Sequence, residues 1–354
     1  MKKQIDIALQ GGGAHGAFTW GVLDRLLEEP DLEIAGISGT SAGAMNAVAL
    51  AQGLCEGSAE RARELLSDYW LAISDAARYS PIQRTVLDRL WGRWSLEYSP
   101  SFILSQHFSR SFSPYQYNPM DINPLKDIVE DIFDFDLINR SETPRLFLSA
   151  TNVRTGRPKV FRQPYLSAEA VMASACLPFM FQAVEIDGEA YWDGGYMGNP
   201  PLFPLIDETS ARDVVLIQIN PFYREEVPKT AYEIENRLNE ITFNGSLIKE
   251  LRSIGFLYEL IQHEGLEREA YRDARLHMIG AEAEMRDLSV SSKLNAERQF
   301  LHHLHKLGRT TAETWIDQHW EDVGKRTTWS PRFVFEESLK PAHLPEEEER
   351  ELDS

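Results

Sequence analysis

The sequence predicts an α/β protein of three layers, in which helices cover both faces of a mostly parallel sheet, with a helical C-terminal addition. Short apolar runs alternate with stretches of helical periodicity from residue 5 to residue 220, and this alternation is typical of βαβ units. Residues 5–50 already contain a strand, a glycine-rich loop, a helix, a second strand and a second helix. Parallel strands joined by such crossovers belong to one sheet.

The N-terminal elements are predicted from apolar spacing and from residues that end helices. Residues 5–9 form an apolar run that we expect to be the first strand, and the helix after the following loop ends at Pro30. A second strand is predicted over 33–38 and a second helix over 42–50. The first helix has apolar residues at helical spacing, namely Phe18, Val22, Leu23, Leu26 and Leu27.

The middle of the chain is less regular. Residues 58–94 are predicted to be helical, whereas residues 95–120 are rich in serine, proline and aromatic residues and predict a long loop. Two interpretations of this loop stay open: a lid or acyl-chain wall, or a packed surface loop. A further helix is expected to begin at Asn123-Pro124, with the asparagine as N-cap, and to end near residue 133.

The remaining elements continue the alternation. Asp187-Gly188 predicts a tight turn between two short strands, the second of which ends at Asp193. We divide the chain into a catalytic α/β core (1–225), a mostly helical C-terminal extension packed on that core (226–335) and an acidic tail (336–354). Strands are expected at 146–151, 153–161, 214–219 and 275–279, and helices at 168–175, 230–263 and 293–320.

Composition excludes several classes of function. The chain has 354 residues, of which 43% are apolar, so it can bury a large core. A net charge of -19 argues against nucleic-acid binding and against electrostatic docking to anionic lipid. Two cysteines cannot build a disulfide framework or a zinc site. No apolar stretch is long enough for a transmembrane helix, and the first residues do not resemble a signal peptide. We therefore expect a cytoplasmic protein whose membrane contact, if any, is peripheral.

Residues 39–43 read Gly-Thr-Ser-Ala-Gly and lie between the second strand and the following helix. A G-x-S-x-G sequence in this setting is typical of a nucleophile elbow, a sharp turn that exposes the serine hydroxyl. Side chains at Gly39 and Gly43 would collide with the neighbouring strand and helix, and the serine itself is expected to be strained. Ser41 is therefore the candidate nucleophile of an acyl-transfer reaction, although structural turns can carry the same pattern.

The loop Gly11-Gly12-Gly13-Ala14-His15-Gly16 joins the first strand to the first helix. This loop and the elbow both follow parallel strands, so they face one site. Backbone amides at a helix N-terminus favour negative charge, which makes Gly11, Gly12 and Gly13 candidates for an oxyanion hole. The loop also fits the dinucleotide fingerprint G-x-G-x-x-G. That interpretation requires an acidic residue at the end of the second strand, where this chain has Ile37-Ser38.

A serine nucleophile needs a general base, and spacing alone leaves two candidates open. His277 is the only histidine that fits the order Ser-Asp-His, but it falls inside a predicted strand. Asp193 stands on a glycine-rich turn with Gly194 and Gly195. It would act as a base only through close contact with Ser41 and some burial. The same three residues could also be a simple turn.

The chain resembles the patatin-like phospholipase family in four features that follow one another in the family's order. They are the Gly11–Gly16 loop, the elbow around Ser41, the segment Ala-Ser-Ala-Cys-Leu-Pro at 173–178, and Asp193-Gly194-Gly195. The resemblance covers residues 5–220 and implies a patatin-like three-layer fold. It also implies a dyad, in which Ser41 is the nucleophile and Asp193 the general base, without a catalytic histidine.

The resemblance further implies an oxyanion hole made by the amides of the glycine loop, and a reaction that needs no metal ion and no cofactor. The implied activity is hydrolysis of acyl esters, commonly phospholipids or lysophospholipids, through an acyl-enzyme. The elbow and its surroundings would be supported by Gly16, Gly39, Gly43, Gly194 and Gly195.

Two alternatives to a lipid acyl hydrolase stay open: an intracellular polyester depolymerase of the polyhydroxyalkanoate type, and a non-catalytic lipid-binding or regulatory protein. Expected partners are acyl-ester or lipid substrates, with transient contact at a membrane or lipid-droplet surface and no nucleic acid. Head group, acyl length, sn-position and oligomeric state have no signature in the sequence.

A few residues outside these motifs invite a functional interpretation. His15 stands where the family usually has arginine or lysine; it could titrate and change activity, or only hydrogen-bond locally. Trp192 could shield Asp193 from water or fill the core. Cys176 is expected to be a small buried residue. A histidine cluster on the last helix is expected to flank a leucine stripe rather than to bind a metal, and it consists of His302, His303 and His305.

Overall fold

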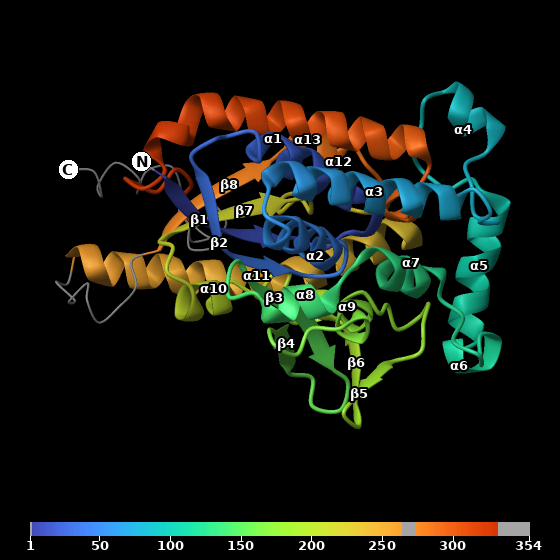
Figure 1. The fold of residues 1–354 in the computed structure, drawn as a ribbon. Coiled ribbons are helices and arrows are strands. Elements are labelled where there is room, and N and C mark those ends of the chain that lie inside the picture. Colours follow the sequence, from blue (N-terminus) through green and yellow to red (C-terminus); the bar gives the residue numbers. More distant parts are fainter. Residues whose placement is uncertain (1, 264–273, 332–354) are drawn as a thin grey trace, which may run out of the picture.

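The computed structural model describes residues 2–263 and 274–331 of the chain. The strands in these residues belong to a single sheet of eight strands (Figure 1). In chain order they are β1 (Lys3–Leu9), β2 (Leu32–Gly39), β3 (Arg145–Asn152), β4 (Pro158–Arg162), β5 (Val184–Ile186), β6 (Glu189–Asp193), β7 (Asp213–Gln218) and β8 (Arg275–Gly280).

Helices surround this sheet and form most of the rest of the described chain (Figure 1). The α-helices are α1 (Gly16–Leu26), α2 (Ala42–Cys55), α3 (Ala59–Ala77), α4 (Val86–Leu90), α5 (Pro100–Ser111), α6 (Pro114–Tyr117), α7 (Pro124–Ile132), α8 (Phe135–Arg140), α9 (Ala168–Ser174), α10 (Phe203–Glu208), α11 (Ala231–His263), α12 (Glu282–Arg286) and α13 (Arg298–His319). Short 3-10 turns are η1 (Gly13–His15), η2 (Gly194–Tyr196), η3 (Val290–Leu294) and η4 (Trp320–Asp322).

The sheet is mostly parallel, as the sequence predicts. Its order is β5-β6-β3-β2-β1-β7-β8, with β4 paired to β3 outside this path. The pairs from β3 through β2, β1 and β7 to β8 are parallel, whereas β4 and β6 run antiparallel to β3. All five parallel strands therefore end at one edge, and that edge carries the glycine loop after β1 and the elbow after β2.

Alternating side chains of β1 show why the fold has three layers. Ile5, Ile7 and Leu9 belong to a large core that also contains buried residues of α1, α2 and α13. Ala8 points to the other face, where a second core includes residues of α10 and α11, such as Leu205 and Leu247. A central strand buried on both faces needs helices on both, so the predicted three-layer α/β/α class is confirmed.

The C-terminal extension packs on the core and also contributes a strand to the central sheet. Its strand β8 pairs with β7 along the whole of both strands, and α13 crosses α1. At this crossing, a Cβ on Gly21 would collide with the backbone of His305, and a Cβ on Gly308 would collide with that of Phe18. The two glycines therefore allow the helices to touch backbone to backbone.

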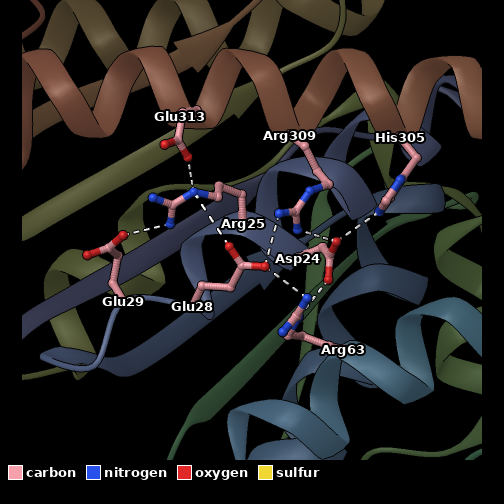
Figure 2. A network of polar contacts seen from close by, with 8 residues as sticks. All are labelled: Asp24, Arg25, Glu28, Glu29, Arg63, His305, Arg309 and Glu313. Carbon is pink, nitrogen blue, oxygen red and sulfur yellow. Dashed lines mark hydrogen bonds and ion pairs between the residues drawn. The ribbon is translucent and has the colours of Figure 1, made fainter.

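Charged residues also link α13 to the core, as Figure 2 shows. Asp24 of α1 accepts hydrogen bonds from Arg63 of α3 and from Arg309 and His305 of α13. Glu28, in the turn just after α1, accepts from the same two arginines at 2.9 Å each. This network of Asp24, Glu28, Arg63, His305 and Arg309 joins three helices on one face of the sheet.

The structure corrects two predictions about the middle of the chain. Residues 95–120 are not a long loop, because α5 and α6 occupy much of this segment. Residues 58–94 are not one helical region, because α3 ends at Ala77 and only α4 is helical after it. The acidic tail at 336–354 lies outside the described residues. Among the helices that are described, none is both long and apolar enough to cross a membrane.

Candidate active site

Ser41 stands in the sharp turn between β2 and α2. Its φ of 55° lies in the left-handed region, which is unusual for a residue with a side chain. A Cβ on Gly39 would lie 2.5 Å from the carbonyl oxygen of Gly43, and a Cβ on Gly43 would collide with the carbonyl of Leu9. Only glycine fits at both positions, so the strand and helix can approach closely and hold the strained serine between them.

A second serine, Ser174, fixes the backbone of the elbow. Its buried hydroxyl accepts a hydrogen bond of 2.9 Å from the N–H of Ser41. Ser174 is the last residue of α9, and it belongs to the segment at 173–178 that suggested the family. The sequence identified this segment without showing what its serine contacts.

Asp193 ends β6 beside the sheet's parallel part, and Ala150 of β3 is its pairing partner. Its side chain is fully buried. Oδ1 accepts a hydrogen bond of 2.7 Å from the N–H of Gly195, while Oδ2 has no partner of normal hydrogen-bond geometry among the described residues. A Cβ on Gly194 would collide with the backbone of Ser149, so the turn after Asp193 also depends on glycine.

Burial raises the pKa of Asp193 to about 7. The N–H of Gly195, the hydroxyl of Ser41 and the charge of Lys293 oppose this rise, but they do not cancel it. A carboxyl with a pKa near neutrality can take up and release a proton at physiological pH, which an ordinary aspartate does poorly. Asp193 lines the same cavity as Ser41 and is fully buried, so its surroundings are compatible with the role of a general base.

His277, the other candidate base, does not fit the role of a general base for Ser41. It lies inside β8, opposite Val215 of β7, and its side chain is fully buried. Its Nε2 is 2.9 Å from Oδ1 of Asp213, and its Nδ1 is 2.8 Å from the hydroxyl of Thr328. It does not line the cavity that contains Ser41. Both ring nitrogens therefore take part in structural contacts, one with the neighbouring strand β7 and the other with Thr328 after η4.

The glycine loop reaches the elbow, but its three glycines are not equivalent. The N–H of Gly11 donates to Oδ1 of Asn199 at 2.6 Å, and its carbonyl accepts from Asn220 at 2.7 Å. This amide is already used, so Gly11 must be removed from the candidate oxyanion donors. A Cβ at Gly11 would lie 2.8 Å from the Cβ of Ser41, which explains why glycine is needed there.

Gly12 and Gly13 remain as candidate donors. Both line the cavity together with Ser41 and Asp193. They stand at the start of η1, where helical geometry leaves backbone amides without an intrahelical partner. Gly13 has a φ of 59°, and a Cβ there would collide with the carbonyl of Lys293. Gly16 lets α1 approach α2, because a Cβ on it would be 2.9 Å from that of Ala42.

A cavity of about 1110 Å³ opens above Ser41 and Asp193. It exceeds the range of about 300–1,000 Å³ that is usual for small-molecule sites. Helix α5, from the segment predicted to be a loop, supplies part of its wall. The apolar side chains that line it include Met45, Tyr69, Trp70, Ile73, Phe102, Leu177, Phe181 and Phe243.

His15 is buried and its Nε2 lies 2.7 Å from Oγ of Ser292. The hydroxyl of Ser292 donates to the carbonyl of Ser289, so its oxygen accepts the Nε2–H of His15. Burial and the charges of Lys293 and Arg224 hold the pKa of His15 well below its usual value. The imidazole is therefore neutral at physiological pH, which favours local hydrogen bonding over the proposed titration.

The other residues that the sequence suggested, Cys176, Trp192 and the histidine cluster, do not line the cavity. Burial raises the pKa of the Cys176 thiol to about 12, so it stays protonated. The histidine cluster is divided between two tryptophans, because His303 stacks on Trp94 while His305 packs on Trp20. No grouping of three or more potential metal-ligating side chains occurs in the described residues.

A sequence model of the family described as patatin-like phospholipase matches residues 7–206. The chain belongs to this family. The matched range contains Ser41, Asp193 and the whole glycine loop, and it ends before the C-terminal extension. The patatin-like fold and the family resemblance predicted from the sequence are thereby confirmed.

Curated relatives carry related names. Lysophospholipase NTE1 of Cryptococcus neoformans is 26% identical over 264 residues, which are 68% of this chain and 14% of the relative. The cGAMP-activated phospholipase of Escherichia coli is 27% identical over 220 residues, 56% of this chain and 53% of the relative. The chain thus spans a small part of the first relative and about half of the second.

Solved structures that match the chain include VipD from Legionella pneumophila and the type III effector ExoU. VipD is 15% identical, with coverage of 90% of this chain and 67% of VipD and a TM-score of 0.38. ExoU is 16% identical, with coverage of 90% and 53% and a TM-score of 0.33.

Proposed function

We propose that this member of the patatin-like family is a serine acyl-ester hydrolase acting on lipid esters. The observation that carries the proposal is the pairing of a strained, cavity-facing Ser41 with a buried carboxyl, Asp193, whose pKa is about 7. A strained nucleophile beside a group that titrates near neutrality is the combination that acyl transfer requires. Family membership and the names of the curated relatives support the same class of reaction.

The proposed reaction has two steps through one acyl-enzyme. Oγ of Ser41 attacks the ester carbonyl carbon while Asp193 takes the hydroxyl proton, and the tetrahedral oxyanion accepts hydrogen bonds from the amides of Gly12 and Gly13. The carbon–oxygen bond to the alcohol breaks, and Asp193 returns the proton to the leaving oxygen. Water then attacks the acyl carbon with Asp193 as base, which releases the acid and restores Ser41.

The cavity favours substrates with a long apolar part. Its wall is largely apolar. Four apolar side chains line the cavity and are also exposed, so they stand at its mouth: Phe108, Ile122, Phe179 and Leu294, which are 45%, 64%, 68% and 40% exposed. We propose that this mouth contacts the surface of a lipid aggregate and that an acyl chain enters the cavity from there.

The test is an ester panel with matched substitutions. We expect Ser41→Ala and Asp193→Asn to lower kcat on a p-nitrophenyl ester by about 10³-fold or more. Ser105→Ala changes another serine of the same cavity, and Asp187→Asn changes an exposed turn residue; both should keep wild-type activity. Full activity in Ser41→Ala would refute the proposal. Activity on lysophosphatidylcholine distinguishes a lipid hydrolase from a polyester depolymerase, which would prefer hydroxybutyrate oligomers.

A further inference from the structure

Lys293 is a cavity residue that lies outside the part of the chain matched by the family. It belongs to η3 in the C-terminal extension, and the ammonium of its partly buried side chain donates a hydrogen bond of 2.7 Å to Oδ1 of Asn220. Asn220 in turn donates to the carbonyl of Gly11 at 2.7 Å. A direct chain of hydrogen bonds therefore runs from the ammonium to the glycine loop beside Ser41.

The backbone of Lys293 touches the same loop. A Cβ on Gly13 would collide with the carbonyl oxygen of Lys293, so the two segments are in contact at that point. Lys293 also shares the cavity lining with Gly12, Gly13, Ser41 and Asp193. The backbone of Lys293 therefore lies against Gly13, one of the two remaining candidate oxyanion donors, while its side chain is linked through Asn220 to Gly11.

The charges around Lys293 leave its ammonium without a carboxylate of its own. On α11, Glu240 is bound by Arg224 at 2.6 Å and by Arg237 at 3.1 Å. His15, on η1, is neutral because its pKa is depressed. No carboxylate of the described residues lies within ion-pair distance of Lys293, and its attraction to Asp193 acts over a longer range. The positive charge at this place is therefore not neutralised locally.

We propose that Lys293 is a positioning residue for the proposed hydrolysis, which holds the glycine loop through Asn220 and supplies the positive field in which the oxyanion forms. The inference rests on the proposed function of Ser41 and Asp193. During the attack, negative charge leaves the Asp193 carboxylate, which becomes protonated, and appears on the oxyanion at the glycine loop. Because Lys293 is linked to this loop through Asn220, its charge is expected to stabilise the oxyanion more than the Asp193 carboxylate, which would lower the free energy of the transition state.

The burial of Lys293 supports a distinctive pH response. Burial lowers the pKa of its ammonium to about 8, with a further contribution from Arg224 and opposing ones from Glu240 and Asp193. The cation is thus present at neutral pH and lost at moderately alkaline pH. Since its charge also lowers the pKa of Asp193, the removal of Lys293 should move the acid limb of the activity profile to higher pH.

The test compares Lys293→Met, Lys293→Arg and a control, Lys306→Met, in which an exposed lysine of α13 is replaced. The readouts are kcat and KM on a soluble p-nitrophenyl ester across pH 5–10. In Lys293→Met we expect kcat to fall about tenfold or more with KM changed less than about twofold, and the acid limb to move upwards. Lys293→Arg should keep most of the activity and extend it to higher pH, because a guanidinium stays charged.

Several outcomes would overturn the inference. The inference fails if both Lys293 variants have the same pH–activity profile as the wild type. It also fails if both variants lose kcat equally and neither the acid nor the alkaline limb shifts, because that pattern would mean that Lys293 acts only by packing. Thermal melting checks that the variants fold, and if Lys293→Met does not fold, the alkaline limb of Lys293→Arg decides. If Ser41→Ala is inactive while Lys293→Met is unaffected, only the role of Lys293 fails. If Ser41→Ala is active, the proposed function itself fails.

Discussion

Among single residues, Asp193 should determine how the protein responds to pH. Only the ionised carboxylate can take the proton of Ser41, and its pKa is raised to about 7 by burial. We therefore expect kcat/KM on a soluble ester to rise as the pH increases towards 8, with the midpoint of this acid limb near the pKa of this carboxyl. A stopped assay from pH 5 to 8 measures this, and a flat profile would contradict it.

The same raised pKa has a consequence for stability. Between the ordinary aspartate pKa of about 3.9 and the folded value, the native protein keeps Asp193 protonated while the unfolded chain ionises it. The stability that this proton contributes is present below about pH 4 and is lost as pH rises through the folded pKa. Asp193→Asn should therefore be inactive yet more stable than wild type at pH 8, by up to about 4 kcal/mol. Urea unfolding at pH 8 and pH 4 tests the sign.

At the residue scale, contacts between residues close in the sequence could be predicted, whereas contacts between distant residues could not. The elbow and its glycines could be predicted, because strand, turn and helix are encoded within residues 32–55. The contacts of Gly11 could not, because its amide is occupied by Asn199, far along the chain. Lys293 had no sequence signal either, since only the folded chain brings η3 to the glycine loop.

At the scale of elements, α5 and α6 show how a helix can be mistaken for a loop. Each begins with serine followed by proline, at Ser99-Pro100 and Ser113-Pro114. This is the same start signal, a polar N-cap and proline at N1, that correctly predicted α7 at Asn123-Pro124. The low apolar periodicity of the segment hid the signal, because α5 is partly exposed and lines a cavity.

The network of Asp24, Glu28, Arg63, His305 and Arg309 should stabilise the docking of α13. Burial would raise the pKa of Asp24, but hydrogen bonds from His305, Arg63 and Arg309 outweigh it and hold the pKa well below its usual range. Asp24→Asn should cost about 2–3 kcal/mol of unfolding free energy at pH 7, since it leaves two arginines without their central partner.

The pH dependence of that loss follows from the depressed pKa. Stability contributed by Asp24 is present above its unfolded pKa of about 3.9 and is lost as pH falls towards the folded value. The difference between wild type and Asp24→Asn should therefore shrink below about pH 4. Asp317→Asn, an exposed position on α13, is the control and should change little. Equal stability of Asp24→Asn and wild type at pH 7 would show that the network is not stabilising.

For the whole molecule, the boundary between core and extension was the hardest feature to predict. The strand at 275–279 was expected and is present as β8, but its pairing with β7 makes the extension part of the central sheet. Figure 1 shows α13 lying along the same face as α1 and α3. A boundary at residue 225 therefore separates β8 from the strand with which it pairs, and sequence periodicity cannot show which sheet an isolated strand will join.

The molecule as a whole should act better on aggregated lipid than on dispersed ester. Phe179 is exposed at the cavity mouth, and a phenylalanine that enters a lipid surface gains the free energy of burying its ring. Phe179→Ser should lower activity on neutral phosphatidylcholine vesicles about three- to tenfold and leave activity on a soluble ester unchanged. Tyr165→Ser, also highly exposed but not on the cavity wall, is the matched control. A similar loss with both substrates would argue against an interfacial role.

The most direct test of the central claim is covalent labelling of Ser41. A fluorophosphonate that mimics an acyl ester should add one phosphonyl group to the wild-type protein, and peptide mass spectrometry should place it on Ser41. Labelling should be absent in Ser41→Ala, slow in Asp193→Asn and unchanged in Ser105→Ala. A wild-type protein that takes up label at another residue, or that labels equally in Ser41→Ala, would contradict the assignment of Ser41 as the nucleophile.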